Sequence, residues 1–224
     1  PTNSIIRLED YFVADKDADK ESPSQQQEAT VSSPPLPDPD QDVDPDVFLA
    51  KLVESICGFA PNTKPALSLA CFPEISEERI AAYDMQLVVA CRENNVNLLK
   101  ELYQQQNAKL DCCNRFGESL LHMSCRRGFQ EMVKFLLTEA QLNVHIRDDC
   151  GRNPFHDACW NPTPQLEICE LLLERDPSLL LITDSRGFTP FQYARPQDWP
   201  TWRQWLLDHR SHLSKLKDSK SIFC

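Results

Sequence analysis

Apolar residues recur at helical spacing in two parts of the chain, residues 44–58 and the residues from 77 onward. In the first part they form a stripe along one face of a predicted helix, which consists of Leu49, Leu52, Val53 and Ile56. Asp44 can cap this helix, Pro45 suits its first position, and Gly58 suits its end. The sequence therefore predicts one isolated helix, followed by helix after helix without a convincing alternating strand.

The remaining stretches are polar or rich in proline. Residues 14–43 are rich in Asp, Gln, Ser and Pro and cannot bury enough apolar surface to offset the entropy of ordering, so we expect them to be disordered. Before them, "SIIRLEDYFV" at 4–13 is a short apolar island, either a linear docking motif or a fraying terminus. Residues 59–76 contain three prolines, which favours an irregular connector.

The helical part repeats itself. "VVACRENNVNLLKELY" aligns with "HMSCRRGFQEMVKFLL" at an offset of 34 residues. The same register relates Cys91, Cys125 and Cys159; Asn114, Asp148 and Asp184; Gly117, Gly151 and Gly187; and Leu136, Leu172 and Leu206. The last glycine interval is 36 because "NPTP" lengthens a loop, as stacked repeats tolerate. The pattern predicts helix pairs stacked one upon the next.

These residues resemble the ankyrin repeat family, whose hallmark is Asp-x-x-Gly-x-Thr-Pro-Leu-His-x-Ala before a glycine turn and a second, apolar helix. "DDCGRNPFHDAC" and "DSRGFTPFQYA" match it well, and "NRFGESLLHMSCRRGFQEMVKFLL" nearly as well. The resemblance covers roughly residues 80–208, and the repeat at 82–104 lacks the His motif. Gln192 in place of His, the "NPTP" turn and Pro196 depart from the family pattern and favour a capping role for the fourth repeat. The resemblance also implies that the motif histidine hydrogen-bonds nearby groups and fixes the turn.

The predicted fold is all-α, an ankyrin-like solenoid of about four helix-turn-helix repeats with a preceding helix and a disordered acidic N-terminal tail. The predicted boundaries are 1–43 for the acidic, Pro-rich tail, 44–76 for the helix and connector, 77–210 for the repeat domain and 211–224 for a basic tail that frays. Trp199, Trp202 and Trp205 recur at spacings of three. They either cover the last repeat within a cap helix or form an exposed stripe that docks a partner.

Charge separates the tail from the rest. The chain has 224 residues and a net charge of −11, of which −9 lies in residues 1–46. The acidity argues against nucleic-acid binding, which normally needs a basic stripe to displace phosphate counterions. We expect the acidic tail to be a solvated linker, although it could also mimic nucleic acid, act as a tether or occupy the binding face as an autoinhibitor. No apolar run approaches the length of a membrane span, and the first residue is proline, which indicates a processed or truncated chain.

Two His-x-x-Cys pairs, His122 with Cys125 and His156 with Cys159, could supply four zinc ligands. Both pairs occupy equivalent repeat positions, where a cysteine acts as a small hydrophobe between helices about 10 Å apart. We therefore expect a structural role, and a metal or redox sensor is the alternative function. Cys112 and Cys113 lie at a predicted hairpin, where they are either ordinary loop residues or an exposed thiol pair. Cysteines inside apolar helices favour a reduced, intracellular setting, cytoplasmic or nuclear.

No phosphate-binding glycine loop and no hydrolase or metalloprotease motif occurs in the sequence, so we expect a non-enzymatic module without a cofactor. The resemblance implies that hairpin tips and first helices bind a protein partner, with no nucleic acid and no membrane, and we expect a monomer. The residues that this implies for partner binding are Arg115, Phe116, Met123, Arg126, Arg127, Asp149, Asp157, Trp160, Asn161, Arg186 and Tyr193.

Overall fold

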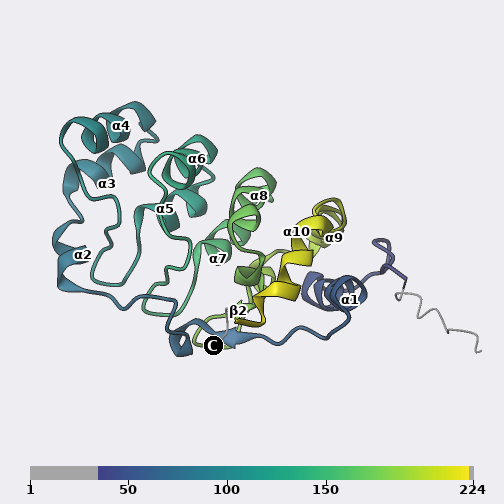
Figure 1. Ribbon diagram of the computed structural model, residues 1–224. Coiled ribbons are helices and arrows are strands. Elements are labelled where there is room, and N and C mark those ends of the chain that lie inside the picture. The colour runs from purple at the N-terminus through teal and green to yellow at the C-terminus, as the bar shows by residue number, and fades with distance from the viewer. Residues whose placement is uncertain (1–34, 222–224) are drawn as a thin grey trace, which may run out of the picture. The chain divides into compact units, whose positions relative to one another are not determined.

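The computed structural model describes residues 35–221, and this part of the chain consists mainly of helices joined by short loops (Figure 1). The predicted all-α fold class is therefore confirmed. The described strands are β1 (Lys64–Pro65) and β2 (Ile182–Thr183), two residues each. None of the helices between residues 35 and 221 combines the length and the apolar character needed to cross a membrane.

Four pairs of helical segments form the stack, where η denotes a 3-10 helix. The pairs are α3 (Met85–Arg92) with α4 (Val96–Gln105), α5 (Leu120–Arg127) with α6 (Gln130–Thr138), α7 (Pro154–Cys159) with α8 (Leu166–Arg175), and η3 (Pro190–Tyr193) with α9 (Trp199–Asp208). The first members contact one another in the order α3, α5, α7, η3, and the second members α4, α6 and α8 form a parallel row (Figure 1). This arrangement is the predicted solenoid of four repeats.

Residues at equivalent positions seal each repeat against its neighbours. They are Cys91, Cys125 and Cys159 in the first helices and Leu102, Leu136, Leu172 and Leu206 in the second helices, all at most 3% exposed. Burying one leucine side chain contributes roughly 1.5–3 kcal/mol. The repeated apolar positions therefore hold the stack together, as the sequence predicts.

The fourth repeat lacks a regular first helix. Arg195 has an extended backbone, with ψ of 140°, because the ring of Pro196 disfavours the helical conformation in the residue before it. The chain then passes through η4 (Pro196–Asp198) into α9. Pro196 thus shortens the first helix as expected.

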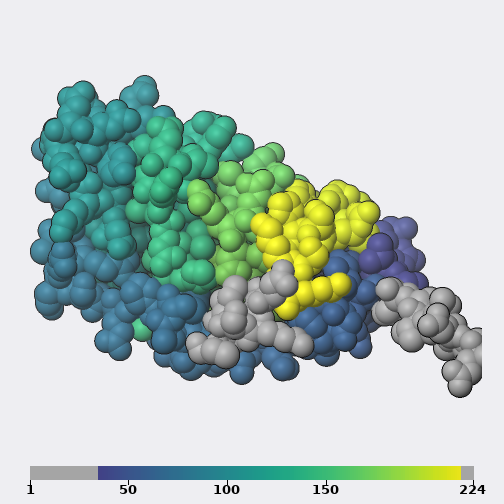
Figure 2. All heavy atoms as spheres, viewed as in Figure 1, coloured from purple at the N-terminus to yellow at the C-terminus, as the bar shows by residue number. Residues whose placement is uncertain are grey.

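The helix α1 (Pro45–Cys57) has the predicted ends, since Asp44 accepts a hydrogen bond from the amide of Asp46 and Gly58 has a positive φ of 76°. Although α1 precedes the repeats in the sequence, it packs against α9, η3 and the C-terminal helices (Figure 1). Its side chains Phe48 and Leu52 are fully buried. Atoms of α1 lie directly beside those of the C-terminal segment (Figure 2). The preceding helix therefore covers the C-terminal end of the stack.

The connector 58–76 runs back along the hairpins to the first repeat. Within it, β1 pairs in parallel with β2, a pairing that the sequence did not predict because it joins distant segments. It continues through η1 (Ala66–Ser68), and Phe72 meets the ring of His145 edge-on at 5.7 Å. The short helix α2 (Glu77–Ala81) follows, and the carbonyl of Arg79 accepts a hydrogen bond from the amide of Cys113.

The C-terminal segment packs on α1, which contradicts the expectation that it frays from residue 211. It forms α10 (Arg210–Leu213) and η5 (Ser214–Ser221), and Leu213 and Leu216 are buried. The 3-10 helix η2 (Pro177–Leu181) contacts η5 from the third repeat. Trp202 and Trp205 are also buried, at 1% and 3% exposed, so they belong to the cap and form no exposed stripe.

Order begins before the predicted boundary at residue 44. The guanidinium of Arg203 donates to the carbonyl oxygens of Pro39 and Val43, each at 2.8 Å, and Arg203 itself is 3% exposed. Most of the predicted disordered tail, including the apolar island at 4–13, lies outside the described residues.

Candidate protein-binding face

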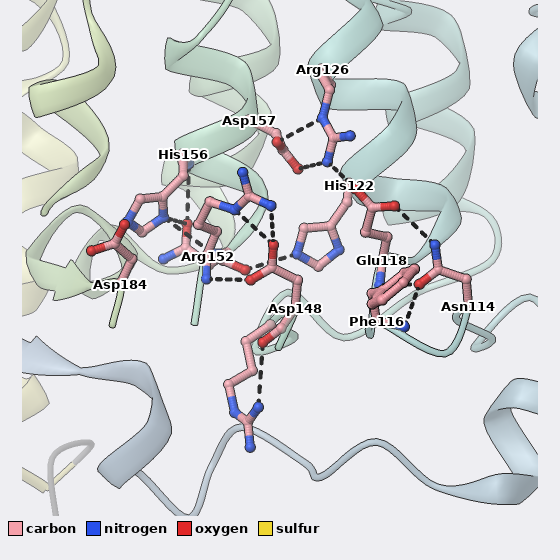
Figure 3. Close-up of polar contacts among 12 residues, drawn as sticks. Asn114, Phe116, Glu118, His122, Arg126, Asp148, Arg152, His156, Asp157 and Asp184 are labelled. Carbon is pink, nitrogen blue, oxygen red and sulfur yellow. Dashed lines mark hydrogen bonds and ion pairs between the residues drawn. The ribbon is translucent and has the colours of Figure 1, made fainter. Parts of the chain in front are cut away.

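Each hairpin is closed by the side chain of its first residue. The Oδ1 atom of Asn114 accepts hydrogen bonds from the amides of Phe116 and Glu118, and Asp184 does the same two repeats later for Arg186 and Phe188 (Figure 3 labels the first set). At the first hairpin a Cβ on Gly117, whose φ is 78°, would lie 2.8 Å from a methyl group of Ile75 in the connector. Both the positive φ and this close approach require glycine.

Neighbouring hairpins are joined through their backbones. The amide of Asp149 donates to the carbonyl of Phe116 at 2.8 Å, and the amide of Ser185 donates to the carbonyl of Cys150 at 2.7 Å. The tips are thus held in a fixed order beside the first helices. We call the surface formed by the hairpin tips and by α3, α5, α7 and η3 the inner face.

One histidine in α5 and one in α7 join these helices to the next hairpin. The Nδ1 atoms of His122 and His156 accept the backbone N–H of their N-cap residues, and the Nε2 atoms lie 3.0 Å from the carbonyl oxygens of Arg152 and Phe188 (Figure 3). An Nε2–H donor fits both contacts. Burial lowers the pKa of His156 to about 4, which keeps this ring neutral at pH 7. The expectation that the motif histidines fix the turns is confirmed.

The histidines of the His-x-x-Cys pairs are engaged within the repeats. Both ring nitrogens of each histidine already have partners within the chain, and burial raises the pKa of the Cys125 thiol. In residues 35–217 one group, Asp148, Asp149 and Cys150, has potential ligand atoms within 4.8 Å of one another. The carboxylate of Asp148 already accepts hydrogen bonds from Arg152, so we assign Asp148 a structural role in closing its hairpin.

Cys112 and Cys113 are fully buried, which contradicts the exposed thiol pair that we left open. The segment around Arg79 covers them, through its carbonyl bond to Cys113 and its ion pair with Asp111 at 3.0 Å. Burial raises the pKa of Cys112 to about 12. The thiolate, which is the reactive form, is therefore disfavoured at neutral pH.

Most predicted binding residues lie at the surface of the inner face. The exposed ones are Arg115, Phe116, Arg126, Arg127, Asp149, Trp160 and Arg186, and the half-buried ones are Met123, Asn161 and Tyr193. Whether they bind a partner stays a prediction.

Asp157 differs from the others because it is only 1% exposed. Its carboxylate accepts two hydrogen bonds from Arg126, at 2.9 and 3.3 Å, and Arg126 also donates to Glu118 at 2.6 Å (Figure 3). We therefore remove Asp157 from the candidate contacts, because Arg126 of the preceding repeat covers it. Asp157 and Glu118 instead hold the Arg126 guanidinium in place.

A basic pocket of about 320 Å³ opens on the inner face between the first two described repeats. Its lining includes Met123 together with Arg92, Arg126 and Arg127. Arg92 and Arg127 are exposed, and neither guanidinium group has a hydrogen bond or ion pair with residues 35–217. Two guanidinium groups here are thus available for an anionic group, which they can bind in bidentate fashion.

An aromatic cluster lies at the other end of the inner face. The rings of Trp160 and Tyr193 are 5.6 Å apart, and Phe188 meets Tyr193 edge-on at 6.4 Å. The guanidinium of Arg186 lies over Phe188 at 4.7 Å. Trp160 and Phe188 remain 53% and 40% exposed. Sequence reasoning missed Phe188, although its place directly after Gly187 in the hairpin could have indicated an exposed ring.

Comparisons with known proteins match the helix pairs described above. Ankyrin repeats, in three copies, are matched over residues 87–182. The putative ankyrin repeat protein YahD of Escherichia coli K12 is 30% identical over 123 residues, which cover 54% of this chain and 60% of that protein. The ankyrin repeat and KH domain-containing protein mask of Drosophila melanogaster is 29% identical over 118 residues, 51% of this chain and 3% of that protein. Human SMC5-SMC6 complex localization factor protein 1 is 27% identical over 121 residues, which cover 53% of this chain and 10% of that protein. The chain spans less than two thirds of each relative.

Proposed function

We propose that the chain, whose residues 87–182 match ankyrin repeats, is a non-enzymatic protein-interaction module or adaptor that binds its partner on the inner face. The observation that carries this proposal is Trp160, a large aromatic side chain that is 53% exposed on a surface otherwise fixed by hydrogen bonds. Tryptophan is enriched among residues that dominate interface energy. A rigid surface also loses little conformational entropy on binding.

The charges of the inner face favour an acidic partner. The available guanidinium groups of Arg92 and Arg127 line the basic pocket, and Arg115 lies over the ring of Phe116 at 4.6 Å. An acidic segment with an apolar residue could therefore place carboxylates in the pocket and the apolar side chain on the aromatic cluster. An interface of this kind would bury about 1,200–2,000 Å² in total.

The state of the cysteines supports an intracellular, cytoplasmic or nuclear setting. The nine cysteines between residues 57 and 169 are all free thiols. Reduced thiols in buried positions are usual inside the cell, whereas secreted domains tend to pair them. In this setting we propose a monomer that recognises its partner through shape and charge, without a cofactor.

Site-specific photocrosslinking tests the binding face. A benzoylphenylalanine at position 160 or 116 should capture a discrete protein partner in cells. The matched control carries the same group at position 134, an exposed lysine on the outer helix α6. Arg127→Glu should abolish the crosslink from position 160, whereas Lys134→Glu should leave it unchanged. Equal capture from position 134, or no capture from the inner face, would contradict the proposal.

A further inference from the structure

A second surface lies on the outer side of the stack, away from the inner face. Between α8 and α9 there is a groove of about 550 Å³, whose lining includes Leu166, Glu167, Glu170, Pro200, Trp205 and Asp208. We propose that this groove binds a basic peptide segment of a partner protein, with an arginine side chain placed between the carboxylates. The inference goes beyond the proposed function because it concerns a different face and a partner of opposite charge.

The groove exists because the last repeat is irregular. In the regular part of the stack, α6 and α8 pack closely, whereas α9 contacts α8 less closely and packs instead against α1 (Figure 1). The 3-10 segments before α9 replace a full first helix, and α9 packs less closely on α8 than α8 packs on α6. A space of this size is typical of a ligand-binding cleft.

The acidic lining of the groove is not a general property of the outer helices. Glu170 occupies the register position that Lys134 holds in α6 and Lys100 holds in α4. Glu167 and Asp208 are exposed, and Glu170 lies 3.3 Å from His209. No lysine or arginine lines the groove within the described chain. The concentrated negative charge is therefore open to a cation from outside.

The apolar part of the lining favours a peptide over a free cation. Leu166 and Pro200 offer apolar surface along which the methylene groups of an arginine can lie while its guanidinium meets the carboxylates. Trp205 is 3% exposed, and its indole N–H has no hydrogen-bond partner among residues 35–217. A buried donor without an acceptor is costly, and a backbone carbonyl of a bound peptide is a suitable acceptor once the side chains that cover the indole move aside.

Fluorescence anisotropy with the full chain and a fluorescein-labelled hexa-arginine peptide tests the proposal. The double substitution Glu167→Gln and Glu170→Gln should weaken binding of the peptide about tenfold or more. The matched control, Glu101→Gln with Glu131→Gln, removes two exposed charges from α4 and α6 and should change the affinity less than about twofold. Binding to the groove should also shift the indole N–H resonance of Trp205, identified by its loss in Trp205→Phe.

Four outcomes would overturn the proposal. Equal weakening by both double variants would mean that the peptide responds only to total charge. Unchanged affinity in the groove variant, or no binding at all, would place the peptide elsewhere or nowhere. Displacement of the peptide by spermine at an equal concentration of cationic groups would identify a site for small polyamines.

Discussion

The three regular repeats and the C-terminal end of the described chain are stabilised in different ways. In the regular part, the rings of His122 and His156 bond the following hairpin at 3.0 Å. In the fourth repeat, Gln192 keeps only the bond within its own turn, where its Oε1 accepts the amide of Thr189 at 2.9 Å. No hairpin follows the fourth repeat in the described chain, so a histidine there would have no carbonyl to bond.

The C-terminal end is instead closed by a segment that comes before the repeats. The helix α1 supplies its apolar face, and Thr189 donates to the carboxylate of Asp46 at 2.6 Å. In a simple solenoid each repeat depends on its neighbours in sequence. Here the connector 58–76 joins the cover of the last repeat to the start of the first. The stability of the last repeat therefore depends on residues far away in the chain.

The largest expected effect comes from removing part of that cover. Phe48→Ala should lower the free energy of unfolding by about 3–5 kcal/mol, because the fully buried ring leaves a cavity. Hydrogen exchange should accelerate first in α9 and α10, which lie next to α1, and least in α5 and α6. Denaturant unfolding and native-state hydrogen exchange measure the two effects.

Val47→Ala is the matched control, because Val47 is the adjacent residue of α1 and is 48% exposed. It should change stability by less than about 0.5 kcal/mol. If Phe48→Ala left exchange in α9 unchanged, α1 would be a dispensable appendage and the C-terminal end would be closed by its own residues.

The regular repeats could be predicted because their signal is local and recurs. Leu172 and its equivalents mark the second helix of each repeat. Asp44 and Gly58 mark the two ends of α1 within the sequence itself. The position of α1 could not be predicted, since it depends on pairs such as Asp46 and Thr189 that have no common pattern. Similarly, Asp157 occupies a register position that is half-buried in the neighbouring repeats, at Met123 and Tyr193, but here Arg126 covers it.

Loss of a hydrogen bond between repeats should lower stability by less than loss of the Phe48 ring, but by more than loss of a bond within one turn. His156→Gln should keep the bond to the turn of Asn153 but lose the bond to Phe188, which lowers stability by about 1–2 kcal/mol. Gln192→Ala removes only a bond within one turn and should cost about 1 kcal/mol or less. Urea unfolding of both variants measures the difference. Equal losses would mean that the histidine acts within its own turn only.

The smallest expected effect is a pH dependence of opposite sign in the two regions. Burial raises the pKa of Asp46 from about 3.8 to about 6, and the neighbouring charge of Asp44 also raises it, although the bond from Thr189 lowers it. A raised pKa in the folded state means that the contribution to stability is present below pH 3.8 and is lost as the pH rises through 6. For His156 the pKa falls to about 4, so its contribution is present above pH 6.5 and is lost as the pH falls through 4.

Asp46→Asn should therefore stabilise the chain at pH 7.5, where the native carboxylate is charged and partly buried, and should have little effect at pH 4. We expect a gain of no more than about 1 kcal/mol, because Asp46 is partly solvated and its charge interacts favourably with the N-terminus of α1. Urea midpoints at the two pH values measure it, and Asp40→Asn, at an exposed position nearby, controls for the change in net charge. A loss of stability at pH 7.5 in Asp46→Asn alone would show that the charged carboxylate strengthens the contact with Thr189. In that case α1 would be held at the last repeat by a charged hydrogen bond, and apolar burial would account for less of its attachment.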